Sequence, residues 1–481
     1  MNDPRAVLDL AERREALDPA RSFIVQAPAG SGKTELLTQR YLALLARVAH
    51  PEEIVAITFT RKAANEMRNR VLGALEAAAR DARPNEEHKA LTWDLARAAL
   101  AQNAARGWDL GATPGRLRIS TIDSFCAALT RQMPLLTRFG APPTTVEDAQ
   151  PLYREAAREL LADLEEGRQW SAAIERLLLH LDNDLARVEE LLADMLARRD
   201  QWMRHLANST TEGRRRDRFE AGLKDLIRAA LARLGGAWTG ALSGELVGEL
   251  IALARYAGGN LAAAKSDSKI ARCTALRSLP GADVADLPPW EALAALLLTS
   301  DGAWRGSVNV KQGFPADDGS SGKAGKARCQ AMKQRFLALL AALRHHDDLR
   351  RPLDGVRTLP PPAYDDDQWQ VLEALCELLP LAAAKLWLTF QRRAQTDFTE
   401  VAWGALRALG GEGEPTDLAL KLDYRIQHLL VDEFQDTSVS QYQLLARLTN
   451  GWQPNDGRTL FVVGDPMQSI YRFRQAEVGL Y

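Results

Sequence analysis

The sequence has 481 residues, with 61 Lys and Arg against 63 Asp and Glu, and a formal net charge of −2. Hydrophobic residues make up 46% and charged residues 26%, a composition typical of globular proteins that excludes a wholly disordered chain. The length predicts about three domains or subdomains, and the near-zero net charge excludes a simple polybasic nucleic-acid tail but not a local basic groove.

Signals for disulfides, secretion and membrane insertion are lacking in the sequence. Four cysteines lie far apart and form no C-x-x-C pair, which argues against a disulfide scaffold or a cysteine zinc site. Residues 1–18 are charged throughout, without the apolar core of a signal peptide. No stretch approaches the roughly 18 apolar residues of a transmembrane helix. We therefore expect a cytoplasmic protein with no membrane partner.

The first 135 residues alternate apolar, β-rich runs with helical patterns. Helices are expected from about residue 33, from Arg61 and from Ser124. Strands are expected at 22–27, 53–60 and 116–122. Strand and helix alternating at this spacing predict right-handed βαβ units and a parallel sheet.

The sequence APAGSGKT lies between the first expected strand and its helix. Gly30 and Gly32 let successive N–H groups face one concavity beside a helix N-terminus. Lys33 can reach the β- and γ-phosphates, and the Thr34 hydroxyl can ligate Mg²⁺. The strict pattern begins with Gly, where this chain has Ala27, and the alternative is a Gly-rich turn with a chance Lys-Thr pair. The predicted nucleotide-binding residues are Ala27, Pro28, Ala29, Gly30, Ser31, Gly32, Lys33 and Thr34.

The middle of the chain, 136–395, has a different character. Apolar residues recur at helical spacing over 152–164, 174–181 and 185–196, and no strong strand run is present. We therefore expect an all-helical module. Arginines around Trp202 could form a DNA-facing strip, although such a helix face is more often only solvated; these are Arg198, Arg199 and Arg204.

From residue 396 the α/β character returns. The runs 425–434 and 458–465 are apolar and end in acidic residues, as buried strands do when their carboxyl ends face a site. We therefore predict one α/β domain in two parts, 1–135 and 396–481, interrupted by the helical insertion at 136–395.

Two acidic residues, Asp432 and Glu433, follow the first of these runs. A carboxylate at a strand end can hold Mg²⁺ from the side opposite Thr34, and its neighbour can orient and deprotonate an attacking water. Because two buried acids repel, an ion between them and the phosphates accounts for the pair. The alternative is a solvated acidic turn.

The segment 462–474 follows the last expected strand. Asp465 and Gln468 could sense a γ-phosphate or its water. Tyr471 and Phe473 stand among arginines, and aromatic faces beside cations suit stacked bases. The alternative is that these aromatic side chains pack in the core.

Five segments, taken in order, resemble the UvrD/Rep-type superfamily 1 DNA helicases. They are APAGSGKT (27–34), TFTRKAANEM (58–67), STIDSFC (120–126), VDEFQD (431–436) and GDPMQSIYRFR (464–474). Segments 22–37 and 177–202 are similar to the AddA-type and exodeoxyribonuclease V beta-subunit branch.

The resemblance implies a RecA-like, P-loop ATPase domain that uses ATP and Mg²⁺. The partners that it implies are single-stranded or duplex-end DNA and a helicase–nuclease subunit. Lys33 and Thr34 would bind ATP phosphates and Mg²⁺, and Asp432 would bind Mg²⁺. Glu433 would be the catalytic base, and Gln468 would couple the γ-phosphate state to DNA. The implied DNA contacts are Thr58, Phe59, Thr60, Thr121 and Phe473.

Three departures from the family pattern stand out. Family members place a Gln before an Arg near the N-terminus to read adenine, and this chain has Arg13 before Arg14; the resemblance implies a nucleotide contact for Arg14. Asp123 stands where a His is common, and we expect it to cap the following helix. The chain stops at Tyr481, before the second RecA-like lobe that the family would place next.

The sequence therefore predicts the N-terminal lobe of an ATP-dependent DNA helicase or translocase of recombinational repair. We expect this chain alone to hydrolyse ATP slowly and not to unwind DNA, because the second lobe would complete the ATP site. The alternative is a non-catalytic nucleotide-binding or DNA-binding regulatory module.

Overall fold

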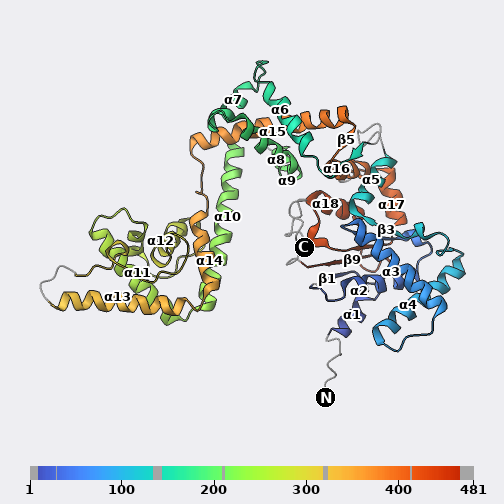
Figure 1. Ribbon diagram of the computed structural model, residues 1–481, viewed down its shortest axis with the longest axis horizontal. Helices are drawn as coiled ribbons and strands as arrows, with labels where there is room; N and C mark the ends of the chain where they lie inside the picture. The colour runs from blue at the N-terminus through green and yellow to red at the C-terminus, as the bar shows by residue number, and fades with distance from the viewer. Residues whose placement is uncertain are drawn as a thin grey trace. The chain divides into compact units, whose positions relative to one another are not determined.

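The computed structural model describes six stretches of the chain, within which every structural statement below is made. They are residues 9–28, 30–133, 143–207, 212–317, 323–411 and 414–465. The chain divides into two compact units, one of residues 1–206 with 374–481 and one of residues 207–373. Figure 1 shows that the first unit contains the β-sheet and that the second is helical.

Within the described residues, the first unit is built on a five-stranded parallel sheet in the order β1-β9-β8-β2-β3. The strands are β1 (Phe23–Gln26), β2 (Ile54–Thr58), β3 (Arg118–Thr121), β8 (His428–Val431) and β9 (Thr459–Gly464). The two late strands β8 and β9 therefore lie between β1 and β2. All five predicted strands are confirmed, and each is shorter than its apolar run.

Helices cover both faces of this sheet. The helices on one face are α2 (Lys33–Leu45), α3 (Arg61–Arg80) and α4 (Glu87–Arg106). Those on the other are α5 (Ile122–Gln132), α16 (Phe398–Leu409), α17 (Asp417–Arg425) and α18 (Val439–Leu448). Along β2, Ile54 and Ala56 face the first group, and Val55 and Ile57 face the second. Because both faces are buried, the strand is a continuous apolar run rather than an alternating one.

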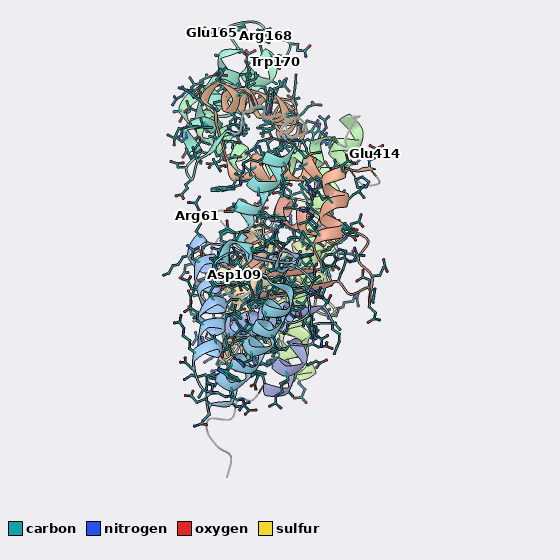
Figure 2. All side chains as sticks on the ribbon, turned by 90° about the vertical axis from the view of Figure 1, so that its right-hand side faces the viewer. Arg61, Asp109, Glu165, Arg168, Trp170 and Glu414 are labelled. Carbon is teal, nitrogen blue, oxygen red and sulfur yellow. The ribbon has the colours of Figure 1, made fainter. Side chains whose placement is uncertain are left out.

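Further helices complete the first unit. They are α1 (Leu10–Ala16), α6 (Gln150–Ala162), α7 (Ser171–His180), α8 (Leu185–Ala197), α9 (Arg199–Ala207) and the later part of α15 (Asp366–Arg393). At the turn between α6 and α7, the Trp170 indole N–H donates to Asp163 Oδ2 at 3.0 Å, and Figure 2 shows Glu165 and Arg168 beside it.

Two short strand pairs in the first unit were not anticipated. Parallel β4 (Thr144–Thr145) pairs with β5 (Gln395–Thr396), and antiparallel β6 (Gly410–Gly411) pairs with β7 (Glu414–Pro415). Strands of two residues are too short to leave a periodic pattern in a sequence.

The second unit contains helices and no strand among its described residues. Its α-helices are α10 (Glu212–Ala241), α11 (Gly244–Ala263), α12 (Leu287–Leu297), α13 (Lys323–Leu343), α14 (Asp347–Gly355) and the start of α15. Trp238 and Trp290 are fully buried in its core, with ring centroids 5.7 Å apart in an edge-to-face arrangement.

The expected fold class, a parallel α/β domain interrupted by a large helical insertion, is confirmed. The two compact units meet at 206/207 and 373/374, so α6 to α9 group with the sheet. The predicted domain limits of 135 and 395 stay a prediction. None of the helices in the described ranges combines the length and the apolar character needed to cross a lipid bilayer.

Candidate functional site

The predicted site segments meet at one edge of the sheet. Because its strands are all parallel, their carboxyl ends lie together. Residues 27–32 follow β1, Asp432 and Glu433 follow β8, and Asp465 follows β9. Since β1, β9 and β8 are neighbours, the glycine-rich loop and the acidic pair converge from opposite ends of the chain.

The loop after β1 has the backbone of a phosphate-binding turn. Gly30 and Gly32 have φ of +75° and +83°, in the left-handed region that favours glycine. Gly32 is the N-cap of α2, and Lys33 and Thr34 are its first two residues. The first N–H groups of a helix lack partners within it and point outward. The loop therefore presents donors and a positive helix end to an anion. Ala29 lies outside the described residues.

Lys33 is a buried cation with no hydrogen bond among the described residues. Its side chain is 10% exposed, and its Nζ lies 3.6 Å from Glu433 Oε2. A buried ammonium without hydrogen bonds is destabilising, so this position suits the arrival of an anionic group.

Asp432 carries a strongly perturbed carboxyl group. Burial raises its pKa to about 7, and the neighbouring Glu433 carboxylate adds to the increase, while the Glu433 backbone N–H and Lys33 oppose it. Such a group favours a proton or a metal cation close by. No cluster of three or more His, Cys, Asp or Glu side chains suited to a metal occurs among the described residues. Mg²⁺ is commonly held by one or two carboxylates together with substrate phosphates, which fits a carboxyl group such as Asp432 at the carboxyl end of β8.

Glu433 and Gln435 form the turn after Asp432. Glu433 has a φ of +51°, an uncommon conformation for a residue other than glycine. Gln435 Nε2 donates to Glu433 Oε2 at 2.7 Å, and Gln435 Oε1 accepts from the Asp465 N–H at 3.0 Å. Gln435 was not among the predicted site residues, although its place in VDEFQD was a usable signal.

A cavity of about 540 Å³ borders the phosphate-binding loop. Arg13 lines it and donates to the Ser31 carbonyl. Arg14 also lines it and pairs with Glu87 at 2.5 Å, so its predicted contact with the nucleotide remains a prediction. The full lining is Arg13, Arg14, Gly30, Ser31, Gly32, Glu35, Gln39, Arg83, Glu87, His88, Leu91 and Asp94.

A second pocket, of about 520 Å³, lies at the carboxyl ends of β2 and β3. Three of the residues predicted to contact DNA line it: Phe59, Thr60 and Thr121. Both threonines are helix N-caps, since Thr60 Oγ1 accepts from Ala63 and Thr121 Oγ1 accepts from Ser124. Thr58 is only 2% exposed and is not part of the lining.

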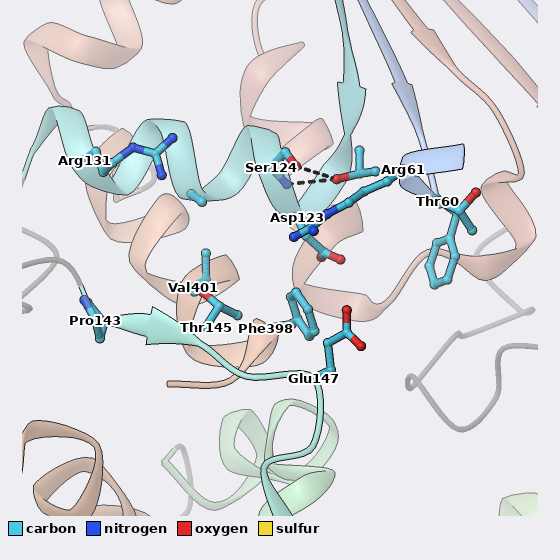
Figure 3. Close-up of a pocket in the computed structure, with 13 residues that line it drawn as sticks. Thr60, Arg61, Asp123, Ser124, Arg131, Pro143, Thr145, Glu147, Phe398 and Val401 are labelled. Carbon is cyan, nitrogen blue, oxygen red and sulfur yellow. Dashed lines mark hydrogen bonds between the residues drawn. The ribbon is translucent and has the colours of Figure 1, made fainter. Parts of the chain in front are cut away.

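The other wall of this pocket is made by residues that were not predicted from the sequence. Figure 3 shows Arg61, Asp123 and Ser124 on one side and Phe398 with Glu147 on the other. Phe398 is the first residue of α16 and had no motif to mark it. The complete lining is Phe59, Thr60, Arg61, Thr121, Asp123, Ser124, Ala127, Arg131, Pro143, Thr145, Glu147, Phe398 and Val401.

Two expectations are wrong. Asp123 does not cap α5, because Thr121 does so, and Asp123 instead accepts from Gln441 Nε2 at 3.1 Å. Arg199 is not on a DNA-facing strip, because it is 1% exposed and bonded to Asp397. Gln468, Tyr471 and Phe473 lie outside the described residues.

Comparisons with known proteins identify similar chains. The family model described as the UvrD/REP helicase N-terminal domain matches residues 9–242 and 323–481. The chain is 26% identical over 488 residues to one subunit of the ATP-dependent helicase/nuclease of Bacillus mycoides (strain KBAB4). It is 27% identical over 483 residues to the protein of the same name from Lysinibacillus sphaericus (strain C3-41). These matches cover 96% and 95% of this chain but 35% of each relative, so the chain spans about a third of the relatives' length.

Proposed function

Because the chain belongs to the UvrD/REP helicase family, we propose that it forms the N-terminal ATP-binding lobe of an ATP-dependent DNA helicase or translocase. The observation that carries the proposal is the convergence of Lys33, Asp432 and Glu433 at the carboxyl edge of the sheet. Lys33, which has no hydrogen bond among the described residues, lies there beside two carboxylates. Hydrolysis of a nucleoside triphosphate uses such a Lys to bind the phosphates and such carboxylates to hold Mg²⁺ and orient the water.

Each residue has a defined role in this proposal. The backbone of 30–34 and Lys33 bind the phosphates, since both present positive charge to one point. Thr34 and Asp432 would hold Mg²⁺, which when bound neutralises charge on the phosphates. Glu433 accepts the proton of the water that attacks the γ-phosphorus, and the bridging oxygen leaves with ADP. Gln468 would sense the γ-phosphate.

The pocket beside β2 and β3 is proposed to hold single-stranded DNA. Phe59 and Phe398 supply aromatic faces for bases, and Arg61 and Arg131 supply charge for the backbone. Phe473 completes the proposed DNA contacts, whereas Thr58, at 2% exposed, is too buried to make one. Because β8 lies between β9 and β2 in the sheet, the strand that precedes Glu433 adjoins both the strand that ends at Asp465 and the strand that ends at this pocket.

The broader assignment follows the names of the relatives. They are subunits of ATP-dependent helicase/nucleases, so we propose that the chain acts on DNA ends in recombinational repair, together with a helicase–nuclease subunit. Slow hydrolysis by this chain alone and a lack of unwinding remain part of the proposal.

The test is single-turnover ATP hydrolysis by the chain and by Glu433→Gln. The variant should keep ATP binding and lose hydrolysis. Glu414→Gln, which alters an exposed carboxylate on β7, is the matched control and should behave as the parent. If the hydrolysis rate were the same in all three proteins, the proposed ATPase activity would be contradicted. The non-catalytic nucleotide-binding module would then be favoured.

The DNA assignment has a separate test, the affinity for an oligo(dT) strand. Phe398→Ala should weaken binding by about 1–3 kcal/mol, the usual contribution of one base stack. Tyr424→Ala removes an aromatic that is 86% exposed on α17 and should leave affinity unchanged. Affinity should also fall steeply with salt; a salt-independent affinity would exclude phosphate contacts.

A further inference from the structure

Gln435 joins two parts of the ATP site through the two ends of one amide. It is 1% exposed, and both ends of its side chain are hydrogen-bonded. Its Oε1 accepts from the Asp465 N–H at 3.0 Å, and its Nε2 donates to Glu433 Oε2 at 2.7 Å. Because the Asp465 N–H can only donate, the oxygen must face it and the NH₂ group must face Glu433. The orientation of this amide is therefore determined by its partners.

Glu433 has few other restraints. Its side chain is 36% exposed and its backbone is in the left-handed region. The same oxygen, Oε2, is approached by Lys33 at 3.6 Å, which is beyond hydrogen-bond distance. When Lys33 turns to bound phosphates, Gln435 remains as the amide that holds this carboxylate.

We propose that Gln435 is a positioning residue that ties the carboxylate of Glu433 to the end of β9, so that Asp465 and Glu433 move together. The inference rests on the proposed ATPase function and goes beyond it by naming the residue that orients the base. Asp465 directly precedes the segment 466–474, for which the sequence predicts γ-phosphate and base contacts. A displacement that these ligands impose on Asp465 reaches Glu433 through one side chain.

A purely structural role would be different. Gln435 would then only satisfy a buried backbone N–H, as buried amides commonly require. Its loss would lower stability, and the rate of the folded protein would not change. Two substitutions separate these roles. Gln435→Met keeps the shape and removes both hydrogen bonds, whereas Gln435→Glu keeps the acceptor for Asp465 and places a second carboxylate against Glu433.

The experiment measures unfolding, ATP affinity with a fluorescent ATP analogue, and the single-turnover rate at saturating ATP. Both variants should keep ATP affinity within about twofold and lose roughly 100-fold in rate, the scale expected for a misplaced reacting group. Gln435→Glu should also lower stability, because it buries a second carboxylate beside Glu433, so the rates are compared per folded molecule. Stimulation of hydrolysis by oligo(dT) should also disappear in both variants.

The control is Gln102→Met, which removes a comparable amide donor, bonded to the Val48 carbonyl at 2.8 Å, on α4. It should lower stability without changing the rate. A parental rate for Gln435→Glu, or a rate loss that only follows the unfolded fraction, would overturn the inference while the proposed function stands. Hydrolysis by the parent that does not depend on Glu433, or no hydrolysis at all, would overturn both.

Discussion

The first unit buries two groups of charged side chains, and they differ in how completely each charge is matched. One group surrounds Arg199, whose guanidinium reaches Asp397 through Nη1 at 2.6 Å and Nη2 at 2.7 Å. Asp397 also accepts from the Tyr153 hydroxyl at 2.6 Å and from the Glu400 N–H at 2.8 Å. Burial raises the pKa of Asp397, but the charge and hydrogen bonds of Arg199 outweigh it, so the pKa is lowered.

The other group, around Lys33, lacks this matching. Lys33 makes no hydrogen bond among the described residues, and the pKa of Asp432 is raised to about 7 by burial and by Glu433. In a low-dielectric interior an unmatched charge is destabilising, and a matched one is tolerated. The Arg199 group is therefore completed by the protein itself, whereas the Lys33 group leaves charge unmatched within the described residues.

The largest expected effect on stability comes from removing Arg199, the cation of the matched group. Arg199→Met should lower the free energy of unfolding by about 3–5 kcal/mol, because Asp397 would be left buried without its cation. Denaturant titration measures this change in the free energy of unfolding. Arg393→Met, which removes an exposed partner of Glu155, is the control and should change stability much less. An Arg199→Met protein as stable as the parent would show that the two groups do not differ.

The unmatched group should make the free energy of unfolding depend on pH. The pKa of Asp432 is about 7 in the folded protein against an ordinary 3.8, so the folded state keeps a proton that the unfolded state releases. Stability is therefore lost as the pH rises from about 4 to 7, on the order of 4 kcal/mol in total. Asp432→Asn should remove this loss, so the variant should equal the parent at pH 4 and exceed it at pH 8. Identical pH profiles of unfolding would contradict the raised pKa.

The carboxylate of Asp200 is a second unmatched group, although Asp200 adjoins Arg199 in sequence. Neither of its carboxylate oxygens has a hydrogen bond among the described residues, and burial raises its pKa to about 6. The folded pKa is again the higher one, so stability falls as the pH rises from about 4 to 6, on the order of 3 kcal/mol. Asp200→Asn should be more stable than the parent at pH 7 in denaturant titrations. Saturating Mg-ATP should remove the loss at Asp432 but not this one.

The smallest expected effect on stability is at Lys33. Lys33→Met replaces an unbonded buried cation with an apolar chain of similar length. The free energy of unfolding should change by no more than about 1 kcal/mol, because removing the burial penalty of the cation offsets the loss of its ion pair with Glu433, whose side chain is 36% exposed. Binding of the fluorescent ATP analogue should nevertheless be lost. A fall of several kcal/mol in unfolding free energy would mean that Lys33 is structurally matched after all.

The sequence by itself determined the sheet, the loop and the acidic pair. Buried parallel strands are continuous apolar runs, so 22–27, 53–60 and 425–434 could be recognised locally. Gly30, Gly32 and Lys33 occur within one turn, and the carboxyl ends of parallel strands meet at one edge. The convergence of Lys33 with Asp432 therefore followed from local patterns and one rule of topology.

Only the tertiary structure decided which other side chains matter. Arg199 has the composition of a solvated or DNA-facing residue, and its burial depends on Asp397, which arrives from a distant segment. Phe398 joins Phe59 in one pocket because α16 packs on the sheet, and Gln435 gains its role from a backbone N–H on another strand. Pairings between distant side chains leave no periodic or compositional signal, because they are set by how elements pack and not by the residues beside them in the chain.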